Sequence, residues 1–107
     1  MQLHYSIFKY KSVPLGIIFH EPFIDYRAFK YTNNISHISQ LTTEFDLAVI
    51  EKLLAGIKED VEQKDAFDIE EFTRFYLNDF YFEEMQIVCC DDIENMVAYI
   101  VQFNLDK

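Results

Sequence analysis

The spacing of apolar residues changes along this chain, and that change constrains the fold more than any other feature. Residues 2–11 alternate, with Leu3, Tyr5 and Ile7 on one face and His4, Ser6, Phe8 and Tyr10 on the other. A period of two with apolar residues at alternate positions predicts a strand that has some apolar cover on both faces. Residues 15–20 form a more continuously apolar strand and residues 26–32 alternate again. The first third of the chain therefore predicts a β-meander.

After this meander the apolar spacing becomes helical. In residues 44–63 the apolar positions form one stripe, which consists of Leu47, Ile50, Leu53, Leu54, Ile57 and Val61. The pattern predicts an amphipathic helix capped by Thr42 or Thr43, with Leu53 in the middle of its buried face. Gly56 falls on the polar side of this helix. Residues 35–41 are compatible with a short preceding helix.

Two more helices are expected, with an extended segment between them. Asp68 and Glu71 have the spacing of a capping box, and the apolar face after it comprises Ile69, Phe72, Phe75 and Tyr76. Residues 80–90 look extended, but their alternation changes phase, which predicts a bulge or turn at Glu83-Glu84. A last helix begins at Asp91-Asp92 and packs through Ile93, Met96, Val97, Ile100 and Phe103.

These segments predict an α+β fold in the order βββ(α)ααβα. We expect a single layer of three to four mainly antiparallel strands packed against two to four helices, with the helices on one face. Residues 1–107 are expected to form a single domain, because this length is near the common domain size. With two Gly and two Pro, the sequence favours long regular elements over tight turns.

Charge is distributed unevenly between the two parts of the chain. Residues 1–40 carry four basic groups and two acids, whereas residues 41–107 carry seventeen acids and five basic groups. The net charge of −10 repels nucleic acid and anionic membranes, and it attracts basic protein surfaces. The only two cysteines, Cys89 and Cys90, are adjacent, which disfavours a disulfide between them. We therefore expect a reduced, cytoplasmic protein that has no membrane contact.

The candidate contact surface lies in the acidic part. Residues 59–94 hold thirteen acids, and many of them are explained by a preference for helix N-termini or by solvated helix faces. Neither explanation accounts for Asp79, Glu83 and Glu84, which flank the aromatic run from Phe80 to Phe82. Aromatic side chains are common in binding hot spots. The predicted partner-binding residues are Asp79, Tyr81, Glu83, Glu84, Asp65 and Tyr76.

Catalytic, metal and cofactor sites are not predicted. His4, His20 and His37 are far apart in sequence, and although His4 and His20 could meet across adjacent strands, no third metal ligand is evident. Cysteines at a strand end are usually buried and unreactive, so neither Cys89 nor Cys90 is expected to be a nucleophile. The sequence contains no phosphate-binding glycine loop and no nucleophile elbow. We expect a protein that is not an enzyme and uses no cofactor.

Several residues give the first sixty positions a resemblance to a known family. These are Tyr5-Ser6-Ile7, Tyr10, Pro14, Gly16-Ile17-Ile18-Phe19, Tyr31 and the helix from Phe45, together with the final helix from Ile93 to Phe103. The pattern resembles a bacterial and phage family known only as a domain of unknown function. That family usually has a Gly-Glu-x-x-Asn stretch between the Pro and the Gly, where this chain has Leu15 alone. The resemblance implies a bacterial or phage origin and implies no mechanism.

Two functions are compatible with these features. The first is a small acidic inhibitor of the anti-defence or immunity type, which blocks a basic protein or nucleoprotein complex such as a nuclease by charge mimicry or by steric hindrance. The second is an accessory or scaffolding domain that self-associates and whose acids serve solubility. The chain is expected to be a monomer or a homodimer.

Overall fold

A six-stranded antiparallel sheet forms the centre of the computed structural model, which describes residues 1–32, 45–63, 65, 67–74, 76–77 and 79–105. Its strands are β1 (Gln2–Tyr10), β2 (Val13–Glu21), β3 (Tyr26–Tyr31), β4 (Tyr76–Leu77), β5 (Phe80–Phe82) and β6 (Gln86–Cys89). The order is β3-β2-β1-β5-β4, and β6 also pairs with β1. The meander predicted from the first third of the sequence is confirmed as β1, β2 and β3.

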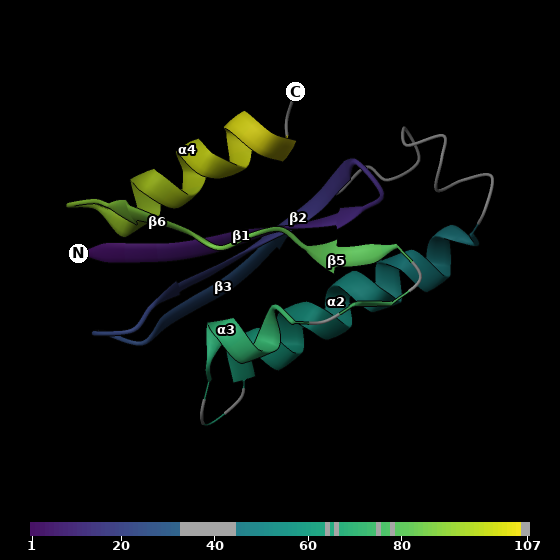
Figure 1. Cartoon of the computed structure of the whole chain (residues 1–107), viewed down its shortest axis with the longest axis horizontal. Helices are drawn as coiled ribbons and strands as arrows, with labels where there is room; N and C mark the ends of the chain where they lie inside the picture. Colours follow the sequence, from purple (N-terminus) through teal and green to yellow (C-terminus); the bar gives the residue numbers. More distant parts are fainter. Residues whose placement is uncertain (33–44, 64, 66, 75, 78, 106–107) are drawn as a thin grey trace.

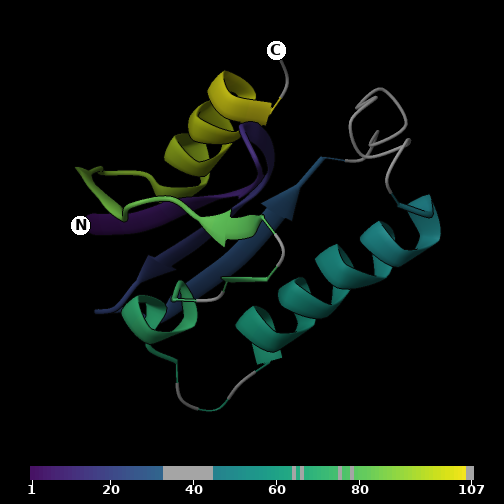
Figure 2. The same ribbon diagram turned by 45° about the vertical axis from the view of Figure 1, so that its right-hand side comes forward.

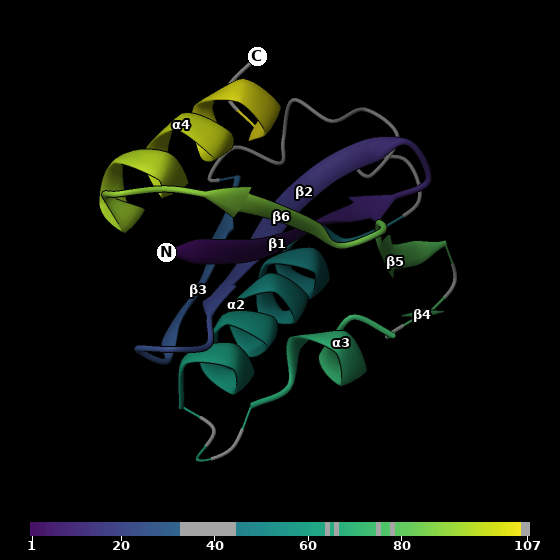
Figure 3. The same cartoon turned by 60° about the vertical axis from the view of Figure 1, so that its left-hand side comes forward.

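Helices cover both faces of this sheet. They are α2 (Leu47–Gln63), α3 (Ile69–Phe72) and α4 (Ile93–Leu105). Helices α2 and α3 lie on one side of the sheet and the yellow α4 lies on the other (Figures 1 and 3). The predicted α+β class is therefore confirmed. The expectation that all helices pack on one face is wrong, because both faces of β1 and β2 are apolar and each needs cover.

The alternation of β1 divides the core into two parts. Phe8 and Tyr10 belong to the core under α2 and α3, whereas Leu3 belongs to the core under α4. Strand β2 contributes to both, with Ile18 on the first side and Ile17 and Phe19 on the second. From α4 the second core receives Ile93, Val97 and Ile100. Hence the two faces predicted for residues 2–11 correspond to two separate helical layers.

Strand β2 has a bulge at Leu15. Phe8 pairs with Gly16 and Lys9 pairs with Pro14, so Leu15 is the extra residue on β2. Pro14 has no N–H to donate and is tolerated at such a bulge. A Cβ on Gly16 would lie 2.6 Å from Cζ of Phe29, so any larger residue there would displace the Phe29 ring. The bulge also places Leu15 in the same core as Ile18.

Helix α2 begins later than its pattern predicts. Asp46 caps it, since its carboxylate accepts a hydrogen bond from the backbone N–H of Ala48 at 3.0 Å. The predicted caps Thr42 and Thr43, and the short helix expected over residues 35–41, lie outside the described residues. The buried residues of α2 are Ile50, Leu54, Ile57 and Val61. Leu53 is only partly buried, so the centre of the buried face is rotated toward Leu54.

The segment after α2 differs most from expectation. Asp68 does cap α3, but it accepts from the N–H of Glu70, and the helix ends at Phe72 after a single turn. Tyr76, predicted on this helix, belongs instead to strand β4. The predicted break at Glu83-Glu84 is confirmed, because Phe8 pairs with Phe82 and Tyr5 with Gln86, which leaves two residues of β1 opposite three.

Helix α4 follows the predicted pattern closely. It is capped by Asp92, whose carboxylate accepts from the N–H of Asn95 at 3.2 Å. Ile93, Val97 and Ile100 are buried and Met96 is partly buried, as expected. Phe103 was expected to pack on the core, but it is 59% exposed and stacks on Tyr99 instead.

The orientation of α2 can be checked by truncating neighbouring leucines. Leu54 is 1% exposed, so Leu54→Ala should lower the free energy of unfolding by about 2–5 kcal/mol through the cavity that it leaves. Leu53→Ala should cost about 1 kcal/mol, because its side chain already meets solvent. Urea denaturation of both variants measures the difference. Equal losses would mean that α2 packs through a different face.

Candidate functional site

Asp79, the first residue of the predicted contact surface, has a local structural role. Leu77 pairs with Phe80, so the connection between β4 and β5 is two residues long. Asp79 adopts a positive φ of 72°, a conformation that Asp and Asn tolerate better than most residues. Its carbonyl accepts a hydrogen bond from the N–H of Lys11 at 2.9 Å. An acidic residue at this position is therefore explained by turn geometry.

Tyr81 and Glu83 also have partners within the protein. The hydroxyl of Tyr81 donates to the carbonyl of Lys11 at 2.7 Å, and the ring is partly buried. Glu83 forms an ion pair with Lys9, and its backbone N–H donates to the carbonyl of Ile7 at 2.8 Å. These contacts join β5 to β1. Lys9 and Lys11 therefore lie on the same surface as the predicted acids.

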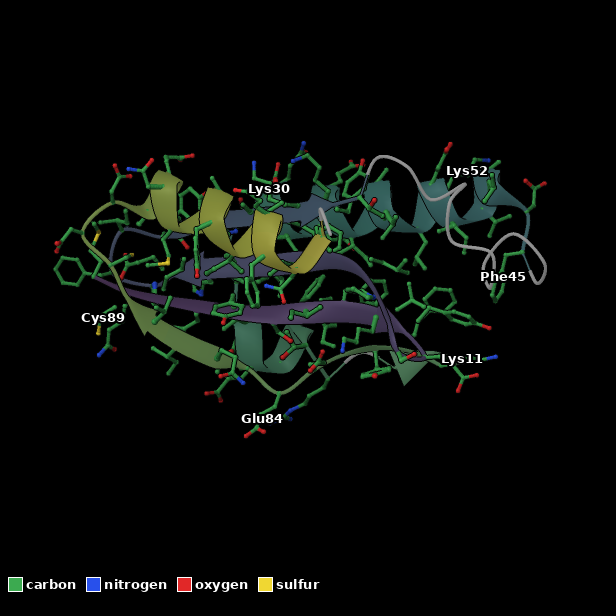
Figure 4. All side chains as sticks on the ribbon, turned by 90° about the horizontal axis from the view of Figure 1, so that it is seen from above. Lys11, Lys30, Phe45, Lys52, Glu84 and Cys89 are labelled. Carbon is green, nitrogen blue, oxygen red and sulfur yellow. The ribbon has the colours of Figure 1, made fainter. Side chains whose placement is uncertain are left out.

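The remaining predicted residues do not complete this surface. Glu84 is exposed and extends outward from the edge of the sheet (Figure 4). Asp65 is exposed, and its carbonyl accepts from Arg27 of β3, which is separated from β5 by β2 and β1. Tyr76 lies in β4, and its side chain falls outside the described part of the structure. The structure thus places Asp79, Tyr81, Glu83 and Glu84 together, with Asp65 near the opposite edge.

An apolar groove lies between α2 and α3, and the sequence did not indicate it. It has a volume of about 500 Å³. Its described lining consists of Lys52, Leu53, Gly56, Ile57, Asp60, Glu71, Phe72 and Phe82. Figure 2 shows the arrangement that forms it, with the short α3 beside the C-terminal part of α2. Lys52, Gly56 and Asp60 are spaced four residues apart, so the sequence places them on one face of α2. The residues of the opposite wall come from distant segments, and only the tertiary fold shows that they lie there.

The turn between β2 and β3 exposes two large apolar side chains. Phe23 is 93% exposed and Ile24 is 56% exposed. The carboxylate of Glu21, which is 3% exposed, accepts from the N–H of Phe23 at 3.2 Å and from that of Ile24 at 2.7 Å. A buried carboxylate therefore fixes the backbone from which both side chains project. This segment lies between the two strands predicted over residues 15–20 and 26–32, and no pattern in the sequence indicated the exposed pair.

Asp25 completes the same turn. It adopts a φ of 54°, and its carboxylate accepts two hydrogen bonds from Arg27, at 2.9 and 2.7 Å. These bonds to Arg27, assisted by a contact with His20, lower the pKa of Asp25 below its usual value of 3.8. The pKa of Arg27 is raised for the same reason. The turn is thus held by charged groups from both of its strands.

Metal binding and nucleophilic catalysis gain no support from the described residues. His4 and His20 do face each other across β1 and β2, as the sequence suggested, and Nδ1 of His4 is buried without a hydrogen bond. Among the described residues, no cluster of three or more His, Cys, Asp or Glu side chains could hold a metal ion. Cys90 is buried as expected, whereas Cys89 is exposed. Within the described part of the chain, no helix combines the length and apolarity needed to cross a bilayer.

The electrostatic role of Asp25 can be measured through pH. Asp25→Asn keeps the tolerance for positive φ and removes the charge, so it should reduce the free energy of unfolding at neutral pH. The pKa of Asp25 is lowered in the folded state. The difference in unfolding free energy between the two proteins should therefore shrink as pH falls through the folded-state pKa of Asp25, because the Asp25 carboxyl then becomes neutral like the Asn side chain. Urea denaturation across this pH range tests the expectation, with Asp91→Asn as an exposed control. A difference that persists at the lowest pH would show that charge is not its origin.

Comparisons with known proteins leave the function to be argued from this geometry. The chain matches no protein-family model, and it has no significant match among curated proteins or solved structures. The resemblance of the first sixty residues to a bacterial and phage family therefore stays a prediction.

Proposed function

We propose that this chain is a small, non-enzymatic binding protein that attaches to a basic surface of another protein and inhibits it. The partner is a nuclease or another component that handles nucleic acid, because such proteins carry positive surfaces complementary to phosphate. A compact acidic protein bound there competes with nucleic acid by charge and by bulk. Inhibitors of the phage anti-defence or immunity type act in this way, in the cytoplasm and without a cofactor.

One observation carries this proposal: most of the described acids in the second part of the chain make no side-chain hydrogen bond or ion pair with another described residue. Fifteen of the seventeen acids in residues 41–107 belong to the described residues. Asp46, Asp68 and Asp92 cap helices. Glu62 and Glu83 form ion pairs with lysines. The side chains of the other ten make no hydrogen bond or ion pair with a described residue.

One of these acids lies at the end of its helix that is unfavourable for negative charge. Asp60 is in the last turn of α2, which has no basic residue. The C-terminal end of a helix carries partial negative charge, and an acid there costs about 0.3–1 kcal/mol. Capping does not account for this placement. A cation supplied by a partner would relieve it.

The proposal predicts that association depends strongly on salt. Association with a panel of basic nucleases should be fast near 0.1 M salt, and its rate should fall steeply as salt rises to 1 M. Over this range the Debye length decreases from about 10 to about 3 Å, so charge attraction is screened. Stopped-flow association rates measure this dependence. The variant Asp79→Lys/Glu83→Lys/Glu84→Lys should bind about tenfold more slowly or worse.

The matched control for that variant must avoid Lys9, which pairs with Glu83. Reversal of the exposed Lys30 on β3 serves better, since it lies near the opposite edge of the sheet. Lys30→Glu makes the chain more acidic, so it should not slow association. Association rates that do not change with salt would remove electrostatic mimicry from the function.

The scaffolding alternative is favoured by the exposed pair Phe23 and Ile24 at a rigid turn. Isolated exposed apolar residues are ordinary, but two adjacent ones held in place provide an anchor for a second copy. On this alternative, light scattering should show a mass above the monomer that grows with salt, because salt screens the repulsion between chains of charge −10. Phe23→Ser should restore the monomer and the control Tyr99→Ser should not. A monomer at every concentration would exclude this alternative.

A further inference from the structure

We infer that the groove between α2 and α3 receives a short basic segment of the partner, one that carries a large apolar side chain beside Lys or Arg. This inference rests on the proposed function and names the feature of the partner that the groove recognises.

The floor of the groove is apolar and is already in place. Phe72 and Phe82 contact each other edge to face, with ring centroids 6.0 Å apart. Phe82 is in turn held by Phe8, at 4.8 Å between ring centroids. Leu53 and Ile57 form the facing wall on α2. A volume of about 500 Å³ lies within the usual range for small-molecule pockets and accommodates one or two large side chains.

Gly56 keeps the α2 side of the groove open. A Cβ at this position would meet no atom within 4 Å, so no close packing within the protein requires glycine here. Glycine in the interior of a helix destabilises the helix relative to alanine. Gly56 lies on the groove wall, where any longer side chain would project into the space that a ligand occupies. Glycine at this position therefore favours ligand binding although it weakens the helix.

The charges at the ends of the groove define the occupant. Asp60 and Glu71 lie on opposite walls, and neither side chain makes a hydrogen bond or ion pair with a described residue. Asp60 is close to the C-terminal end of α2, whose dipole adds to the attraction for a cation. Lys52 lies eight residues earlier on the same helix, about 12 Å away along its axis. The groove is therefore negative at one end, and a bound segment is oriented with its Lys or Arg at Asp60 and Glu71.

A short synthetic lysine peptide with one central phenylalanine is a suitable probe of this groove. Its dissociation constant is measured by isothermal titration, together with that of the same peptide with serine in place of the phenylalanine. The intact protein should bind the first peptide at least about tenfold more tightly than the second, because only the first presents an apolar anchor.

Two pairs of variants separate groove binding from general attraction to acid. Gly56→Phe fills the groove without a change in charge and should weaken binding of the first peptide about tenfold or more, whereas Ala55→Phe, on an exposed position of the same helix, should not. Asp60→Lys/Glu71→Lys should weaken binding more than the equal charge change Asp91→Lys/Glu94→Lys near the start of α4. Unfolding curves confirm that each variant is folded.

The outcomes distinguish this inference from the proposed function. If Gly56→Phe binds normally and both charge reversals weaken binding equally, the proposed function through acidic attraction is retained and the inference of binding in the groove is wrong. If no reversal weakens binding, both ideas fail together. If light scattering shows a dimer that Gly56→Phe abolishes, the groove takes a second copy of this chain, and the basic segment is overturned.

Discussion

Strand β1 carries large apolar side chains on both of its faces, and the remaining architecture follows from the need to cover each of them. Phe8 and Tyr10 are buried under α2 and α3, while Leu3 is buried under α4. Burial of one large apolar side chain contributes about 1.5–3 kcal/mol, so leaving either face of the sheet exposed would cost more than most domains of this size have in net stability. The sheet is therefore the middle layer of three.

This arrangement also explains part of the charge asymmetry. The strands of residues 1–32 form the interior layer, and the helices form the exterior together with their flanking segments, which between them carry most of the acid. Exterior helix faces are polar in any such fold, but polarity alone does not require one sign of charge. The excess of acid over base on these faces, together with Asp60 at the unfavourable end of α2, is what the binding proposal addresses.

Local patterns in the sequence were sufficient where one element determines its own structure. The alternation of β1, the stripe of α4 and the phase change at Glu83-Glu84 are all visible within a few residues, and each is present in the fold. Contacts between distant segments were not visible. The sequence could not show that Lys9 neutralises Glu83, that Tyr81 bonds to Lys11, or that Phe72 and Phe82 meet Leu53 across a groove. Tyr76 was assigned to a helix because its apolar neighbours also suit a helical stripe; its pairing with Tyr81 in β4 depends on tertiary contacts.

The pairing of β1 with β6 has a consequence for how the chain folds. The hydrogen bond from the N-terminal amine of Met1 to the carbonyl of Cys90 joins residues 89 positions apart. The hairpins among β1, β2 and β3 can form from local contacts, but this last pairing must close a loop that contains nearly the whole described chain. Such distant contacts slow folding, and until they form, the face made by Leu3, Ile17 and Phe19 meets water. The slowest step in folding is thus expected to be the one that brings α4 and β6 back to the first strand.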